Sequence, residues 1–133
     1  MEKHILTIVN LSDNTEQNIT FEIHDDADDI IIKSTIDKSE FSCCDRGYFT
    51  AFQKIRDEFL TLGFGIKCNG SRINAVQSGM MSGSERIYLV KLDTPAAMKD
   101  IVNIFDYAEI SDFPNTSMQN DFTEKWFESL KAI

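Results

Sequence analysis

The chain has 133 residues, of which 42% are hydrophobic, and carries a formal net charge of −9 at pH 7. This length fits one domain and allows about two-thirds of the unfolded surface to be buried, so folding needs neither a metal nor a disulfide. The net negative charge disfavours binding to DNA or RNA backbones and to anionic membranes. It is compatible with a basic protein partner.

The apolar runs, the first residues and the cysteines indicate a soluble protein of the cytoplasm. The longest unbroken apolar run, 87–90, has four residues, and 30–32 has three, which is too short to cross a bilayer. Met1 to His4 lack the basic and apolar regions of a secretory signal. Three cysteines are an odd number, which argues against a complete disulfide framework.

The first third of the chain reads as strands. Residues 4–11 are apolar on both faces, as in a central strand, and residues 18–24 alternate between apolar and polar. Turn residues at 12–15 predict a hairpin between them. After the acidic stretch 25–29, which we interpret as a solvated turn, residues 30–36 form a third expected strand.

The clearest helix is predicted over residues 45–62. Its large apolar side chains recur at spacings of three and four residues, which makes one apolar stripe. These residues are Tyr48, Phe52, Ile55, Phe59 and Leu62. Asp45 is expected to cap the first turn, and Gly63 to end the helix in the left-handed conformation.

The remaining elements are shorter. Residues 64–68 and 72–76 flank Asn69-Gly70, a dipeptide that favours a tight hairpin turn. Beyond a strand at 86–92, we expect a short helix at 95–100, an ambiguous segment at 101–105 and a terminal helix at 121–132. The expected docking face of the terminal helix is Phe122, Trp126, Phe127 and Leu130. We therefore predict one α+β domain, a mostly antiparallel sheet with one long amphipathic helix packed on it and a short C-terminal helix.

The candidate ligand site lies in the only part of the chain that is not acidic. Residues 46–92 carry seven Lys/Arg against three Asp/Glu, and small or hydroxyl residues cluster there. The candidate residues are Asn69, Gly70, Ser71, Arg72, Ser78, Gly79, Met80 and Arg86. Glycine amides, serine hydroxyls and arginine can together bind an anion. The competing interpretation is a hairpin turn followed by a mobile loop.

Other reactive residues favour plainer roles. Cys43 and Cys44 precede the expected helix, but acidic neighbours disfavour a thiolate, so we expect a buried structural cysteine beside an inert one. Cys68 is expected to pack as a small apolar residue. His4 and His24 lie on adjacent expected strands, yet they lack further ligands at metal-binding spacing. We expect no metal and no cofactor.

Several short motifs resemble those of a family of small uncharacterised bacterial proteins. They are Asn69-Gly70-Ser71-Arg72, Ser78-Gly79-Met80 and the run Asp-Ile-Val-x-Ile-Phe-Asp at 100–106. The similarity covers roughly residues 45–108. A proline often precedes Ser-Gly-Met in that family, whereas this chain has Gln77, so the start of the loop is expected to be less rigid. The resemblance implies no activity.

Two functions remain open from the sequence. One is a non-catalytic protein-interaction module of bacterial type, such as an immunity or regulatory factor, in which the adjacent Met80 and Met81 suit a contact surface. The alternative is a small-molecule or anion-binding protein, or an enzyme, that uses the 69–86 loop. Nothing in the sequence marks a catalytic group, so the first interpretation is preferred.

Overall fold

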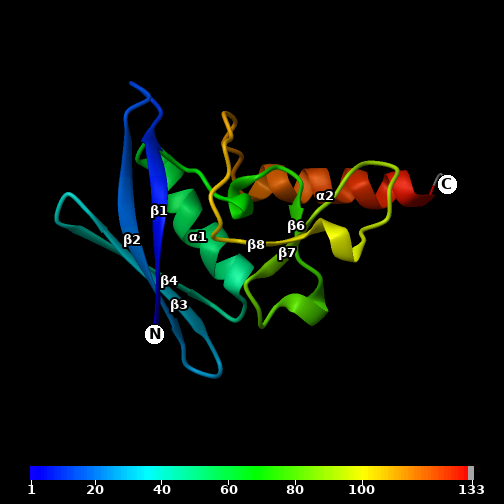
Figure 1. Ribbon diagram of the computed structural model, residues 1–133, viewed down its shortest axis with the longest axis horizontal. Helices are drawn as coiled ribbons and strands as arrows, with labels where there is room; N and C mark the ends of the chain where they lie inside the picture. The colour runs from blue at the N-terminus through cyan, green and yellow to red at the C-terminus, as the bar shows by residue number, and fades with distance from the viewer. Residues whose placement is uncertain (132–133) are drawn as a thin grey trace.

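The chain folds into two antiparallel sheets joined by a helix, in the computed structural model, which describes residues 1–131. The larger sheet has five strands in the order β4-β3-β2-β1-β5, and the smaller has three in the order β6-β7-β8. Figure 1 shows the larger sheet at one end of the molecule, α1 in the middle and α2 at the other end. The predicted α+β class with an antiparallel sheet is confirmed.

The larger sheet buries one face and leaves the other open. Its strands are β1 (Glu2–Asn10), β2 (Glu16–Asp25), β3 (Ile30–Ile36), β4 (Ser39–Asp45) and β5 (Phe64–Ile66). On the buried face lie the predicted apolar rows, with Phe21 and Ile32 fully enclosed. The hairpin between β1 and β2 forms as expected, since Asn14 adopts a positive φ of 61° and the Asp13 carboxylate accepts the Thr15 amide at 2.9 Å.

Strand β4 was not anticipated from the sequence. It pairs with β3 along its whole length, from Ile36 opposite Ser39 to Ile30 opposite Asp45. The connecting residues Asp37 and Lys38 both have positive φ angles, of 48° and 71°. This is the backbone shape of a type I′ hairpin turn, which normally calls for Asn or Gly, so an Asp-Lys pair gives little signal for it.

Helix α1 (Tyr48–Thr61) covers the buried face of the sheet with most of the predicted stripe. It begins three residues later than expected, because Asp45 ends β4, where its carboxylate accepts the Arg46 amide at 2.6 Å. Leu62 is half-exposed and lies outside the stripe. Gly63 takes the predicted left-handed conformation, with φ of +86°.

The predicted hairpin around Asn69-Gly70 is wrong. The segment forms a 3₁₀ turn, η1 (Asn69–Ser71), while β5 pairs with β1 and the short β6 (Ala75–Val76) pairs with β7. The Gly70 amide donates to the Ile104 carbonyl at 2.9 Å. A Cβ at Gly70 would lie 2.8 Å from both Ile104 and Phe52. Glycine is needed here for close packing rather than for a turn.

The smaller sheet resolves the ambiguous segment. Strand β7 (Arg86–Leu89) pairs on its second side with β8 (Ile101–Asn103), so the beginning of 101–105 is a strand. The expected helix at 95–100 is reduced to a single 3₁₀ turn, η3 (Met98–Asp100).

The terminal helix α2 (Thr116–Lys131) is longer than expected. It starts five residues earlier, because the Asn115 side chain accepts the Met118 amide at 2.9 Å and caps the first turn. Its predicted end at Ala132 lies outside the described residues. With 14 residues in α1 and 16 in α2, the expected contrast between a long first and a short terminal helix is not found. Of the predicted docking face, Trp126 is buried and Phe127 is exposed.

Neither helix of residues 1–131 is long enough and apolar enough to cross a lipid bilayer.

A buried polar network joins α1, α2 and η1. Arg56 of α1 is 1% exposed, and its Nη2 donates to the Gln119 Oε1 of α2 at 2.6 Å. Gln119 then donates from Nε2 to the carbonyls of Gly70 at 2.9 Å and Arg72 at 2.8 Å. Gln53 adds a second donor to Gln119 at 3.0 Å. One buried amide therefore links three separate segments.

We expect Gln119→Met to destabilise the protein by about 3 kcal/mol or more in urea unfolding. The substitution removes the partner of several buried groups, and each orphaned group costs about 1–3 kcal/mol. The matched control is Gln17→Met at an exposed strand position, which is expected to change stability by less than about 0.5 kcal/mol. Similar losses in the two variants would contradict the role of the network.

Phe52→Ala is expected to cost about 3–5 kcal/mol, as for other fully buried aromatics, because it opens a cavity where α1 packs against Gly70 and Phe105. Phe127→Ala is the control, since that ring is 52% exposed, and it should cost much less. Chemical denaturation of both variants measures the difference. A loss below about 1 kcal/mol for Phe52→Ala would show that the α1 stripe is not the core.

Candidate functional site

The first half of the predicted anion site is built into the interior. Asn69, Gly70 and Ser71 are all buried. The Asn69 amide group donates to the Asn103 carbonyl at 3.1 Å, and its oxygen accepts from the Arg72 Nε at 3.2 Å. Each of these groups already serves a protein contact, so this half of the candidate site acts to attach η1 to β8.

The two candidate arginines lie at opposite ends of the β6–β7 hairpin. Val76 pairs with Tyr88, and Arg86 begins β7 at the end of the hairpin next to the loop. Arg72 lies before β6, at the other end, in a turn in which the Ala75 amide donates to the Arg72 carbonyl at 3.2 Å. Arg72 borders a shallow hollow of about 270 Å³ whose lining includes the carboxylates of Glu109 and Asp112. These carboxylates disfavour an anion there.

The second half of the candidate site is an exposed loop between β6 and β7. Ser78 precedes the 3₁₀ turn η2 (Gly79–Met81), and Met80 is fully exposed. Gln77 holds the base of the loop, since its side-chain amide donates to the Ser84 carbonyl at 3.1 Å and the Arg86 carbonyl at 2.9 Å.

This loop also closes the start of α1. The Ser82 carbonyl accepts the Tyr48 amide at 3.3 Å, and a Cβ at Gly47 would lie 3.1 Å from the same carbonyl oxygen. The loop carbonyl therefore occupies a position that an anion would take at the helix N-terminus.

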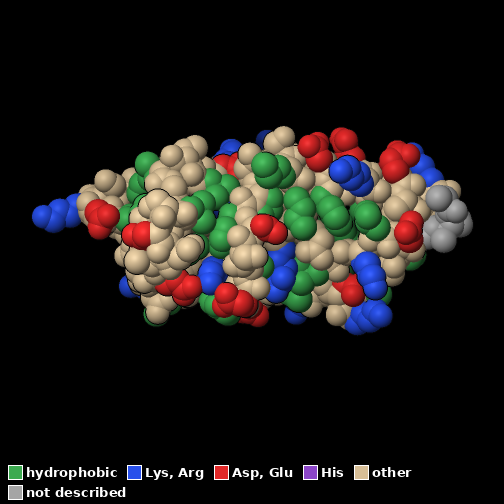
Figure 2. All heavy atoms as spheres, turned by 90° about the horizontal axis from the view of Figure 1, so that it is seen from above, with side chains coloured by type: hydrophobic (Ala, Val, Ile, Leu, Met, Phe, Trp, Pro, Cys, Tyr) green, Lys and Arg blue, Asp and Glu red, His purple; other side chains and the backbone are tan. Residues whose placement is uncertain are grey.

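Much of the positive charge of residues 46–92 is used in internal contacts. Arg56 is buried, and Lys54, although 56% exposed, pairs with Asp45 at 3.1 Å. Figure 2 accordingly shows acidic and basic side chains interspersed along the molecule, without a large basic patch on that face. The excess of Lys and Arg in the sequence does not become a basic site on this face.

Lys67 shows the same internal use. Its ammonium donates to Glu16 at 2.7 Å and to Glu109 at 2.9 Å, and only 9% of its side chain is exposed. The bonds to Glu16 and Glu109 raise the pKa of Lys67. The Tyr107 hydroxyl also donates to Glu109, and this bond, together with the one from Lys67, lowers the pKa of the Glu109 carboxyl. The cluster attaches the segment after β8 to the sheet.

A groove lies over the open face of the larger sheet. It encloses about 780 Å³ over β2, β3 and β4. The open-face side chains that line it are Asn18, Thr20, Glu22, Lys33, Thr35, Glu40 and Ser42. Glu22, Lys33 and Ser42 form one row across the three strands. Thr35 pairs with Glu40 in the next row on the same face.

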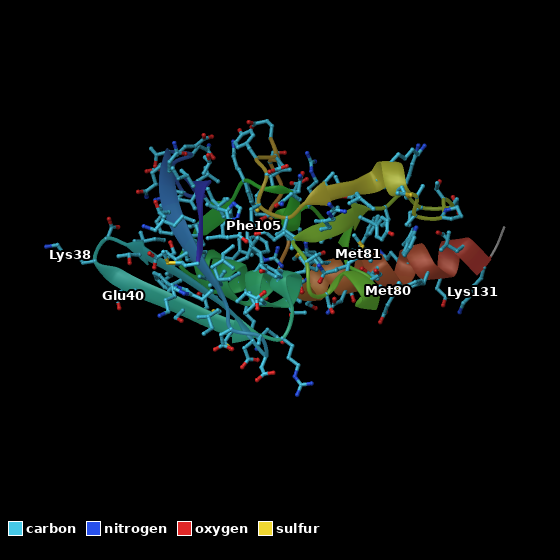
Figure 3. The ribbon with its side chains drawn as sticks, turned by 60° about the horizontal axis from the view of Figure 1, so that its bottom comes forward. Lys38, Glu40, Met80, Met81, Phe105 and Lys131 are labelled. Carbon is cyan, nitrogen blue, oxygen red and sulfur yellow. The ribbon has the colours of Figure 1, made fainter. Side chains whose placement is uncertain are left out.

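The electrostatics of this groove are acidic. Its lining includes three carboxylates, those of Glu22, Asp37 and Glu40, and one ammonium group, that of Lys33, while Lys3 pairs with Glu22 at 4.0 Å. The strands that form the groove belong to residues 1–45, which contain eleven Asp/Glu and three Lys/Arg, a net charge of −8. Figure 3 shows Lys38 and Glu40 at the free end of the β3–β4 hairpin, far from Met80 and Lys131.

The two histidines do not form a common site. His4 pairs with Phe21, so it lies on the face that α1 covers, whereas His24 pairs with Ile31 on the open face. Although their strands are adjacent, the two histidines are therefore not neighbours across them.

The cysteines lie where their expected structural roles require. Cys43 and Cys68 are buried and Cys44 is exposed. Burial raises the pKa of Cys43 to about 11, with Glu58 adding to the shift, and burial also raises the pKa of Cys68 to about 11. Desolvation and the nearby Asp29 raise the pKa of Cys44. None of the three is activated as a nucleophile.

No protein-family model matches the chain, and no curated protein is significantly similar to it.

We expect the thiol reagent DTNB at pH 8 to modify one cysteine in the folded protein. Cys44 is accessible on the open face, while Cys43 and Cys68 are enclosed and hold their protons tightly, so they should react only on unfolding. Cys44→Ser should remove the rapid reaction. Two or three rapid equivalents in the folded protein would contradict the burial of Cys43 and Cys68.

Proposed function

We propose that this protein is a non-catalytic interaction module that binds a basic protein partner through the open face of its larger sheet. The observation that carries the proposal is the acidic groove of about 780 Å³ over β2, β3 and β4. A sheet normally covers an apolar face with another layer, and here α1 covers only one side. The other side is polar and free for a partner.

The chemistry of the groove suits a partner rather than a substrate. Its open-face lining combines hydroxyls, an amide and carboxylates, and these groups are spread along three strands instead of converging on one point. Complementary charge raises the association rate and selects among partners. A basic surface therefore gains from Glu22 and Glu40 in the groove, and the acidic turn 25–29 lies beyond the groove, between β2 and β3.

The alternative function, anion binding by the 69–86 loop, has less support. Asn69 and Arg72 are hydrogen-bonded to each other, and Arg86 lies at the other end of the hairpin. A small acidic protein that binds a basic target fits an inhibitor, such as an immunity or regulatory factor, and we propose this as the biological form of the function.

We expect the wild-type protein to capture a basic protein from the lysate of its host, and the binding to weaken as salt rises. The double charge reversal Glu22→Lys with Glu40→Lys should weaken binding of the captured protein about tenfold or more, which corresponds to about 1.4 kcal/mol. Calorimetry at low and physiological salt measures both effects with the purified partner.

The matched control reverses two exposed carboxylates of α2, Glu124→Lys with Glu128→Lys, which change the net charge equally. The affinity of this control for the partner should be much closer to the wild-type affinity than that of the groove variant. If both double variants lose affinity to the same extent, the effect is one of net charge and the groove is not the binding surface. Capture of a partner insensitive to either change would also refute the proposal.

A further inference from the structure

His4 faces one carboxylate from its own strand and one from the middle of the sequence. Its Nε2 lies 3.0 Å from Oε1 of Glu85 and 3.3 Å from Oε2 of Glu2. Glu2 and His4 are two residues apart on β1 and so point to the same side of the sheet. Glu85 directly precedes β7 and brings the third group from the smaller sheet. One ligand atom from each residue lies within 4.8 Å of the others.

The surroundings hold two of the three side chains in place. The His4 ring stacks on Phe105 with centroids 4.7 Å apart, and Figure 3 shows Phe105 near the centre of the molecule. The Asn103 amide group reaches the second oxygen of Glu85 at 3.4 Å. The side chains of His4 and Glu85 are 26% and 20% exposed, while Glu2 is open to solvent. Two groups are therefore preorganised, and the third can move.

The cluster has more negative charge than its contacts balance. Among residues 1–131, neither Glu2 nor Glu85 forms an ion pair with a lysine or an arginine. Asp25 lies close by and accepts the Tyr48 hydroxyl at 3.3 Å. Burial raises the pKa of Tyr48 to about 12, with contributions from Asp25, Glu2 and Glu85. A single imidazole proton cannot satisfy both carboxylates equally.

The distances fit a tetrahedral metal. Zinc binds histidine nitrogen and carboxylate oxygen at about 2.0–2.2 Å, so two ligand atoms at the corners of its tetrahedron lie roughly 3.3 Å apart. The observed separations of 3.0 and 3.3 Å already match that edge. The two carboxylate oxygens lie within 4.8 Å of each other, and the exposed Glu2 side chain can adjust this separation to the same edge.

We propose that Glu2, His4 and Glu85 bind one zinc-class divalent cation at the junction of the two sheets. The imidazole and two carboxylates are a ligand set that zinc accepts, and three protein ligands leave a fourth position for water or for a group of a partner. Asn103 and Phe105 act as the supporting residues that orient the ligands. The site is separate from the groove and does not depend on the proposed partner.

The test uses untagged full-length protein, stripped with EDTA, in a Cys44→Ser background so that the exposed thiol cannot bind metal. Calorimetric titration with Zn²⁺ should show one saturable site per chain, with a rise in melting temperature by mass action. Mg²⁺ and Ca²⁺ should bind far more weakly, because they prefer all-oxygen sites of higher coordination.

Glu85→Gln and His4→Gln should each weaken Zn²⁺ binding more than about 100-fold, since even loss of an outer-shell partner costs about 10–100-fold. His24→Gln removes the second histidine, which lies on the open face, and should leave the Zn²⁺ affinity unchanged. Absence of saturable binding, or equal affinity in wild type and Glu85→Gln, would overturn the site.

A second measurement needs no ligand variant. Co²⁺ replaces Zn²⁺ as a paramagnetic probe, and its line broadening in NMR spectra should centre on the first residues of β1 and on Glu85. Broadening centred on His24 or on the acidic turn 25–29 would instead show a different site and refute the proposal.

Discussion

The burial of the Arg56 guanidinium is the constraint on which the rest of the structure depends. A charged group at 1% exposure is costly unless its donors are satisfied, and burial lowers the pKa of Arg56 accordingly. Its donors reach Asp57 at 2.8 Å, Thr116 at 3.2 Å and Gln119 at 2.6 Å. Nη1 alone lacks a partner among the described residues.

These bonds explain how the two halves of the molecule stay together. Gln119 accepts from Arg56 and donates to the Gly70 carbonyl of η1. The Asn69 side chain and the Gly70 amide of η1 then donate to the carbonyls of Asn103 in β8 and of Ile104 directly after it. Phe105 adds the apolar part of the junction, since it packs edge-on against Phe52 and face-on against His4. The smaller sheet and α2 are therefore positioned on α1 by one polar network and one aromatic cluster.

The burial of positively charged side chains also affects the charge of the surface. Arg56 and Lys67 are the kind of residue that would otherwise offset the carboxylates, yet they are enclosed in internal contacts. Residues 1–45, which form β1 to β4, carry a net charge of −8, and the carboxylates of Glu22, Asp37 and Glu40 line the groove. Fold and electrostatics thus lead to the same proposal, in which the acidic groove meets a basic partner.

Local patterns predicted much of this fold. Alternation in 18–24 and 30–36 and the stripe of α1 are periodic signals, and the structure confirms their buried faces. The pairing of β5 and β6 was misjudged, because Asn69-Gly70 is a strong local turn signal and tertiary packing against Ile104 overrides it. Strand β4 was missed because Lys38 stands where a hairpin turn favours glycine.

The sites depended on contacts that the sequence does not reveal. The candidate residues 69–72 were chosen for their chemical types, but hydrogen bonds to Asn103, Ile104 and Gln119 use those groups. Glu85 joins Glu2 and His4 only through the fold, over a separation of about eighty residues, and local spacing cannot show it. The groove is also lined by residues of β4, and the sequence did not predict that strand.

Hydrogen–deuterium exchange of the protein with and without its captured basic partner tests the binding surface most directly. We expect the partner to protect amides of β2, β3 and β4 and of the turns between them, and to leave α2 and the loop at 78–84 unchanged. Protection confined to α2 or to the loop around Met80, with residues 16–45 unaffected, would contradict the assignment of the open sheet face as the site of interaction.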